Sequence, residues 1–191
     1  VMRKELLILI KKPFSFKMKK IILCTLISVL SVVIMTFFTN EFVNTGLLGF
    51  GFAASAILIL ITDIKERKRP GVIKYKAIGM KDAAILGISQ ALAVLPGISR
   101  SGTTISTALL LGKDRDESAN FSFLISIPII IGAMIFDIIK EGNNIIENVD
   151  AVNCIVGFVA SFVMALLSIK WMYRIIRKRR WIGFSIYLKK I

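Results

Sequence analysis

Four long apolar segments dominate this sequence and restrict what it can fold into. Residues 21–39, 46–62 and 151–169 contain no charged side chain, and residues 121–139 contain only Asp137, near their end. A transmembrane helix needs about 20 mostly apolar residues, within a range of roughly 17–25. The four segments match this requirement. They predict an all-α fold, a polytopic membrane helix bundle, as a single membrane domain over residues 1–191.

Charged residues lie between these segments, and basic and acidic segments differ clearly in net charge. Residues 1–20, 63–82 and 170–180 carry net charges of +6, +4 and +6, whereas residues 40–45 and 140–150 carry −1 and −2. Short loops rich in Lys and Arg remain in the cytoplasm. The three basic segments are therefore predicted to be cytoplasmic, and the two acidic segments to lie on the opposite side of the membrane.

The overall net charge of +14 also has a second interpretation, which is nucleic-acid binding. The basic residues flank the apolar segments and lack the interleaved aromatic residues of a strand-binding groove, so we exclude nucleic acid as a partner. The chain contains no histidine. It therefore offers no Ser-His-Asp triad, no histidine-ligated zinc and no histidine general base.

Residues 83–111 form a shorter apolar stretch that starts on the cytoplasmic side. It must also end there, because residues 121–139 have to cross to the opposite side, where residues 140–150 lie. The stretch is divided at Pro96-Gly97 into residues 83–95 and 103–111. At about 1.5 Å per residue, these halves reach roughly 20 Å and 13 Å. Neither can cross a hydrocarbon core of about 30 Å. We therefore predict a re-entrant helix–loop–helix hairpin that turns within the membrane.

The tip of this hairpin is rich in turn-forming and hydroxyl residues. Pro96 and Gly97 are expected to end the first helix, and Gly102 to let the backbone turn closely. Ser or Thr favours the N-cap of the second helix. The hydroxyl side chains at the tip are those of Ser99, Ser101, Thr103 and Thr104.

Arg100 is the only charged residue between Asp82 and Lys113. An arginine at membrane depth costs roughly 2.5–3.5 kcal/mol on insertion scales. Its guanidinium suits phosphate oxygens, and the N–H groups that begin a helix also bind anions. We interpret the tip as an oxyanion pocket, most plausibly for phosphate. The alternative is that Arg100 pairs with a buried acid. Gln90, on the first helix, could orient a partner across the pocket or simply pack.

Residues 96–105, Pro-Gly-Ile-Ser-Arg-Ser-Gly-Thr-Thr-Ile, resemble the second signature of the undecaprenyl-diphosphatase family, the bacitracin-resistance phosphatases of bacterial membranes. The preceding residues 90–93 and the tract Glu117–Leu124, followed by Ile127-Pro128, are also similar to that family. The resemblance is strong over residues 83–136 and weaker over the rest of the chain.

The resemblance implies both a reaction and a fold. The family removes the terminal phosphate of undecaprenyl diphosphate, and the resulting monophosphate lipid carries cell-wall precursors at the bacterial plasma membrane. Its fold has two inverted repeats, each with a re-entrant hairpin, and this chain would hold the second. By the same resemblance Arg100 binds the diphosphate, with Ser99, Ser101 and Thr104 as catalytic partners. The residues that complete the substrate-binding set are then Pro96, Gly97, Gly102, Thr103 and Gln90.

The chain also departs from the family pattern. The family's N-terminal glutamate-rich hairpin binds a divalent cation (Mg²⁺ or Ca²⁺), and no counterpart is found here, so we expect no metal ligands in this chain. It is interpreted as lacking the family's N-terminal third. Two alternatives remain open. The chain could be part of a transporter or flippase of a lipid phosphate or another anion, built on broken helices, or a truncated, inactive remnant.

Two further features bear on partners and boundaries. Small residues recur every four positions at Gly157, Ser161 and Ala165, and at 49–53 and 51–55. This spacing allows close helix contact in lipid. We expect packing within the bundle, with a homodimer interface as the alternative. Residues 181–191 are expected to start a last helix that is too short to cross.

Overall fold

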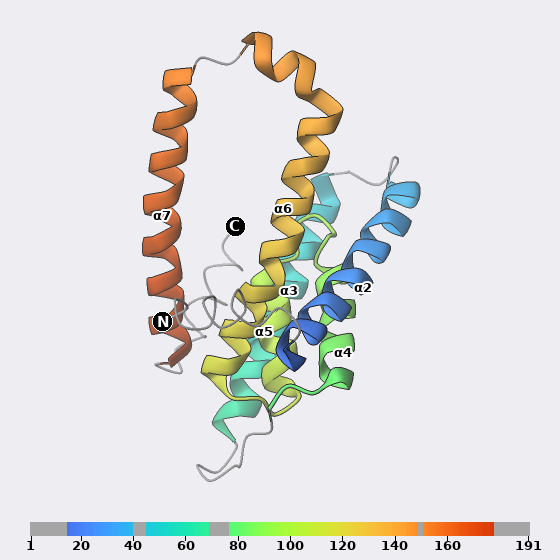
Figure 1. The fold of residues 1–191 in the computed structure, drawn as a ribbon. Coiled ribbons are helices and arrows are strands. Elements are labelled where there is room, and N and C mark those ends of the chain that lie inside the picture. Colours follow the sequence, from blue (N-terminus) through green and yellow to red (C-terminus); the bar gives the residue numbers. More distant parts are fainter. Residues whose placement is uncertain (1–14, 40–44, 69–76, 149–150, 178–191) are drawn as a thin grey trace.

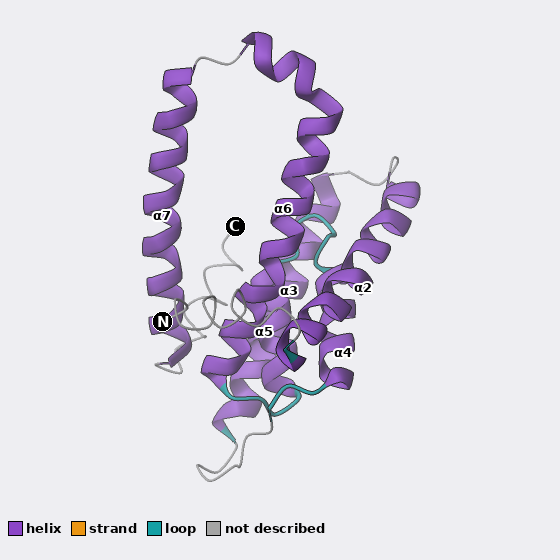
Figure 2. Cartoon of the chain, viewed as in Figure 1, coloured by secondary structure: helices purple, strands orange, loops and turns teal. Residues whose placement is uncertain are grey.

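The computed structural model describes residues 15–39, 45–68, 77–148 and 151–177, and these parts of the chain are helical with short connections (Figures 1 and 2). The helices are α2 (Phe16–Thr39), α3 (Thr45–Arg67), α4 (Met80–Leu92), α5 (Arg100–Leu110), α6 (Arg115–Asn148) and α7 (Ala151–Arg177). No strand occurs within the described ranges. The predicted all-α class is confirmed.

Three helices are long and apolar enough to cross a membrane, over residues 48–66, 115–140 and 152–176. They correspond to the second, third and fourth predicted spans. The first predicted span lies on the 24-residue α2, where the described side chains end at Ser31. Large apolar side chains such as Phe50 and Phe158 are 74% and 73% exposed. Such exposure suits a lipid environment, because water would penalise it.

The hairpin predicted between residues 83 and 111 is present as α4 and α5. These helices have 13 and 11 residues, which makes them about 20 Å and 16 Å long. Both are shorter than a hydrocarbon core of about 30 Å, as a re-entrant hairpin requires. Figure 1 shows α5 (yellow-green) among α3, α4 and α6.

Side chains of α5 take part in two apolar cores. Ala108 belongs to a core with side chains of α2, α4 and α6, including Leu86 and Phe121. Ile105 and Leu109 belong to a second core with side chains of α3, α6 and α7. Because α5 contributes to both cores, the position of its first residue, Arg100, depends on all of the surrounding helices.

The last helix packs differently from the expectation based on its small residues. Every side chain from Val152 to Ser168 on α7 is exposed, and a β-carbon added to Gly157 would meet nothing within 4 Å. The contacts of α7 come from its end, where Tyr173 and Ile176 join the second core. The prediction that the Gly157 face packs within the bundle is therefore wrong for the described residues. Small residues permit close packing, but they do not supply the partner helix.

Candidate anion-binding site

The loop between α4 and α5 turns at Gly97, where φ is +83°. This left-handed conformation favours glycine. The predicted first helix extended to Leu95, but α4 ends at Leu92 and short turns follow, with Val94 N–H donating to Ala91 O and Leu95 N–H to Leu92 O. The reason is Pro96, since proline disfavours a helical conformation of the residue before it.

The second helix of the hairpin starts earlier than predicted, at Arg100 instead of Thr103, and ends at Leu110. Ser99 is its N-cap, and its Oγ accepts a hydrogen bond from the Gly102 N–H at 3.2 Å. The prediction of a Ser or Thr cap is confirmed. The predicted close turn at Gly102 is wrong, because Gly102 lies in the first helical turn. There its lack of a side chain leaves room for Ile59, which a β-carbon would approach to 3.1 Å.

Arg100 is the first residue of α5, and its side chain is half-buried. No carboxylate among the described residues forms an ion pair with it; the ion pairs found there involve Lys113 and Arg115 instead. The first N–H groups of a helix have no partner within the helix, and the Ser99 side chain accepts only that of Gly102. The start of α5 therefore presents a guanidinium and backbone N–H donors at one end, which is the chemistry of an anion site.

The hydroxyl side chains at the tip differ in their contacts and in their burial. Thr104 is 2% exposed, and its Oγ1 donates to the Arg100 carbonyl oxygen at 3.0 Å and lies 2.5 Å from Ser122 Oγ on α6. It therefore ties α5 to α6. Thr103 Oγ1 is buried without a hydrogen-bond partner among the described residues. Ser101 is half-buried beside Arg100.

Gln90 connects α4 to α2. Its side chain is 1% exposed, and its Oε1 accepts hydrogen bonds from Ser28 Oγ at 3.3 Å and from Cys24 Sγ at 3.6 Å. These contacts match the packing role that was one of the two expectations. Within the described part of the chain its Nε2 has no acceptor, and none of its hydrogen bonds involves Arg100.

Sequence reasoning missed the part of α3 that supports the tip. Ser55 Oγ accepts a hydrogen bond from the Ser99 N–H at 2.9 Å. One turn earlier, a β-carbon on Gly51 would lie 2.2 Å from the Pro96 carbonyl oxygen. The small residues at positions 51 and 55 were the available signal. They indicated close packing, and the structure shows that the packing partner is the loop.

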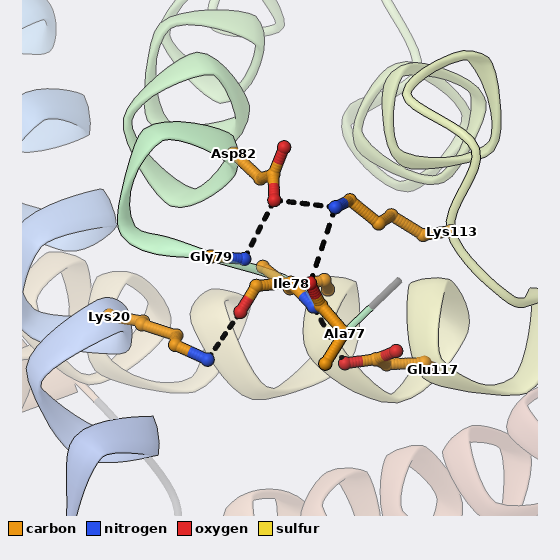
Figure 3. A network of polar contacts seen from close by, with 7 residues as sticks. All are labelled: Lys20, Ala77, Ile78, Gly79, Asp82, Lys113 and Glu117. Carbon is orange, nitrogen blue, oxygen red and sulfur yellow. Dashed lines mark hydrogen bonds and ion pairs between the residues drawn. The ribbon is translucent and has the colours of Figure 1, made fainter. Parts of the chain in front are cut away.

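The opposite end of the hairpin, its foot, is held by charged side chains (Figure 3). Lys113 Nζ lies 2.5 Å from Asp82 Oδ2, which also accepts from the Gly79 N–H at 2.7 Å. The Ile78 N–H donates to Glu117 Oε1 at 3.0 Å, and Lys20 Nζ donates to the Ile78 carbonyl oxygen. Burial raises the pKa of Asp82, but the hydrogen bonds from Lys113 and Gly79 and the charges of Lys113 and Lys20 outweigh it and hold that pKa below its usual value.

A second buried ion pair joins three long helices near the same end. Arg115 on α6 lies 3.4 Å from Glu66 on α3 and donates to the Ile176 carbonyl oxygen on α7 at 3.0 Å. Arg115 and Glu66 are 8% and 6% exposed. A buried charge is costly unless it is paired, so loss of either partner would destabilise the joint between α3, α6 and α7.

The residues at the tip do not fit a divalent cation. Such ions prefer carboxylate and carbonyl oxygens, whereas the tip offers an arginine, hydroxyls and N–H donors. Within the described ranges, no three Cys, Asp or Glu side chains come together as a metal site. The side chain of Asp137 lies outside the described residues. The divalent cation that the resemblance implies therefore remains a prediction.

Comparisons with known proteins point to one family. A family model described as bacitracin resistance protein BacA matches residues 2–190. A protein of Bacteroides thetaiotaomicron named undecaprenyl-diphosphatase is 36% identical, and the match covers 98% of this chain and 73% of the relative. Proteins of the same name from Parabacteroides distasonis and Carboxydothermus hydrogenoformans are 37% and 36% identical, each over 98% of this chain and 73% and 72% of the relative.

Proposed function

Because the chain belongs to the family of the bacitracin resistance protein BacA, we propose that it is an undecaprenyl-diphosphatase. Its substrate is undecaprenyl diphosphate, and its products are undecaprenyl phosphate and inorganic phosphate. Water adds to the terminal phosphorus, and the bond from this phosphorus to the bridging oxygen breaks. The bridging oxygen stays with the monophosphate lipid, which becomes available again as a carrier of cell-wall precursors.

The observation that carries this proposal is Arg100 at the start of α5, without a carboxylate partner among the described residues. A diphosphate supplies the negative charge that this position lacks. The guanidinium and the first N–H groups of α5 bind phosphate oxygens, and Ser101 adds a hydroxyl beside them. Charge that develops on the bridging oxygen is stabilised by the same donors. Ser99 supports the site by capping α5, and Thr104 by tying α5 to α6.

The placement of the chain in the cell follows from the same proposal. The chain is a multi-pass membrane protein of the bacterial plasma membrane, with residues 1–20, 63–82 and 170–180 on the cytoplasmic side. The positive charge of these segments supports this orientation. Cysteines introduced in place of exposed Lys19, Lys65 or Lys170 should react with a membrane-impermeant thiol reagent only when the cytoplasmic face is accessible.

A homodimer would use the exposed face of α7. Gly157, Ser161 and Ala165 all lie on the part of this helix that is exposed, and small residues at this spacing let two helices approach closely in lipid. Disulfide cross-linking of a Gly157→Cys variant in membranes tests this arrangement, with Ile135→Cys on α6 as the comparison position.

The reaction is tested by phosphate release from undecaprenyl diphosphate with the purified chain in detergent, with and without Mg²⁺ or Ca²⁺. We expect release that Arg100→Ala abolishes. Lys81→Ala, which removes an exposed charge on the same hairpin, is the matched control and should keep the activity. If Arg100→Ala and Lys81→Ala behave alike, Arg100 does not bind the diphosphate. Comparison with and without a chelator measures the dependence on a divalent cation.

A further inference from the structure

One face of α3 follows the hairpin tip from the loop into the first turn of α5. The contacts pair residues at helical spacing on α3 with the tip: Leu48 with Gly97, Gly51 with Pro96, Ser55 with Ser99, and Ile59 with Gly102. Three of these four contacts are so close that a β-carbon on the glycine would lie within 3.1 Å of an atom of the partner residue. The loop that precedes Arg100 is therefore held against α3 at Pro96, Gly97 and Ser99.

We propose that Ser55 is a positioning residue for the anion site, acting through Ser99 on Arg100. This inference rests on the proposed function, because it assumes that Arg100 binds the diphosphate. Ser55 does not itself contact the substrate in this view. Its hydroxyl accepts the Ser99 N–H, and Ser99 is the residue directly before Arg100.

The need for Ser55 follows from the way α5 begins. In a capping box, the side chain of the third helical residue accepts the N–H of the N-cap residue. Here the third helical residue is Gly102, which has no side chain to do so. Ser55, on another helix, takes this role. It is 2% exposed, so water cannot replace its hydroxyl without a local rearrangement.

Two linked hydrogen bonds then set the start of α5. Ser55 holds the Ser99 N–H at 2.9 Å, and Ser99 Oγ in turn holds the Gly102 N–H at 3.2 Å. Arg100 lies between these two points in the chain. Loss of the first bond leaves the part-buried Ser99 N–H without its protein partner, and a polar group without a partner is costly in a membrane protein. The Ser99 N–H gains a new partner when the loop moves away from α3, and this movement also displaces Arg100.

The test compares variants of the full chain in detergent by two measurements: the dissociation constant for undecaprenyl diphosphate and the amide hydrogen exchange of peptides from the tip. Ser55→Ala removes the hydroxyl, and Ser55→Thr retains it. Thr62→Val is the matched control. Thr62 lies on the same helix and is also 2% exposed, but its hydroxyl donates to Leu58 of its own helix.

We expect Ser55→Ala to weaken binding roughly fivefold to tenfold, as loss of one hydrogen bond would. It should also speed exchange over residues 97–102 and not over α4. Ser55→Thr should leave both the dissociation constant and the exchange rates close to the wild-type values, and Thr62→Val should change neither. Unchanged binding by Ser55→Ala, or equal effects of Ser55→Ala and Thr62→Val, would overturn the inference. A wild-type chain that does not bind the lipid would contradict the proposed function instead, and the exchange data would still decide whether Ser55 holds the loop.

Discussion

The charged side chains at the two ends of the α4–α5 hairpin differ in whether they have partners within the protein. At the foot, Asp82, Lys113 and Glu117 are all engaged in hydrogen bonds or an ion pair that fix residues 77–82 (Figure 3). At the tip, Arg100 has no carboxylate partner among the described residues. The loop before it is held by backbone contacts with α3, by the Ser55 hydroxyl and by its own cap.

This difference separates structural charges from a charge that serves a ligand. Charges at the foot satisfy one another, so their removal should cost stability and affect binding only indirectly. Arg100 at the tip pairs with no carboxylate among the described residues. Its removal should therefore weaken ligand binding and leave the free energy of unfolding nearly unchanged. An arginine at membrane depth without a partner is expensive, and under the proposed function the bound diphosphate offsets that cost.

The largest expected effect is on ligand binding at the tip. Arg100→Gln should weaken binding of undecaprenyl diphosphate about 100-fold or more, because a charged, bidentate donor is lost. Its thermal unfolding in detergent should match that of the wild type. The measurement is equilibrium binding together with a melting curve. A large drop in melting temperature would mean that Arg100 holds the fold, and the contrast between the two ends would fail.

At the foot we expect a larger effect on stability than on ligand binding. Lys113→Met should destabilise the protein by about 2 kcal/mol, since it leaves the partly buried Asp82 without its cation. Binding per folded molecule should stay within about twofold. Denaturation in mixed detergent measures the first quantity and lipid binding the second. The double variant Lys113→Met/Asp82→Asn should recover part of the lost stability, because no uncompensated charge remains.

A smaller effect is expected for the cap at the tip. Ser99→Ala should cost about 1 kcal/mol of stability, the usual value for an N-cap. It should also weaken binding, in contrast to Lys113→Met, because α5 would lose its fixed start beside Arg100. Ser31→Ala is the control, since the Ser31 hydroxyl donates only within its own helix, to the Ile27 carbonyl oxygen. Equal effects of the two variants would argue against a special role for the cap.

The smallest effect is the pH dependence of stability at the foot. The pKa of Asp82 lies below its usual value of 3.8 in the folded protein. Its contribution to stability is therefore complete above about pH 4 and is lost as the pH falls through the lower folded-state value. Melting temperatures between pH 3 and pH 7 should show this decline, and Asp82→Asn should flatten it. An unchanged slope in the variant would assign the decline to other carboxylates.

Much of the hairpin could be predicted from local sequence. The apolar stretches, the Pro96-Gly97 break and the Ser99 cap all act within a few residues, and the helices, the turn and the start of α5 are found near the expected positions. Boundaries shifted by about three residues for equally local reasons. Proline shortened α4 at its end, and the serine cap started α5 earlier than expected.

The orientation of individual side chains could not be predicted in the same way. Thr104 was expected to face the anion, yet it faces Ser122 on α6. Gln90 could have faced the tip, yet its hydrogen bonds go to α2. A hydroxyl or amide in an apolar surrounding turns to whichever partner satisfies it, and that partner lies on a helix whose position is not encoded nearby.

The sequence alone was enough to specify helices of membrane length, a short hairpin and an arginine at its tip, because composition and local backbone preferences control these features. Packing determined which of the tip residues are half-buried and which are buried between helices, and that α3 supports the loop. The bond from Ser99 to Ser55 joins residues 44 positions apart. Contacts of this kind depend on how two helices meet, and a single sequence does not contain that information in any local pattern.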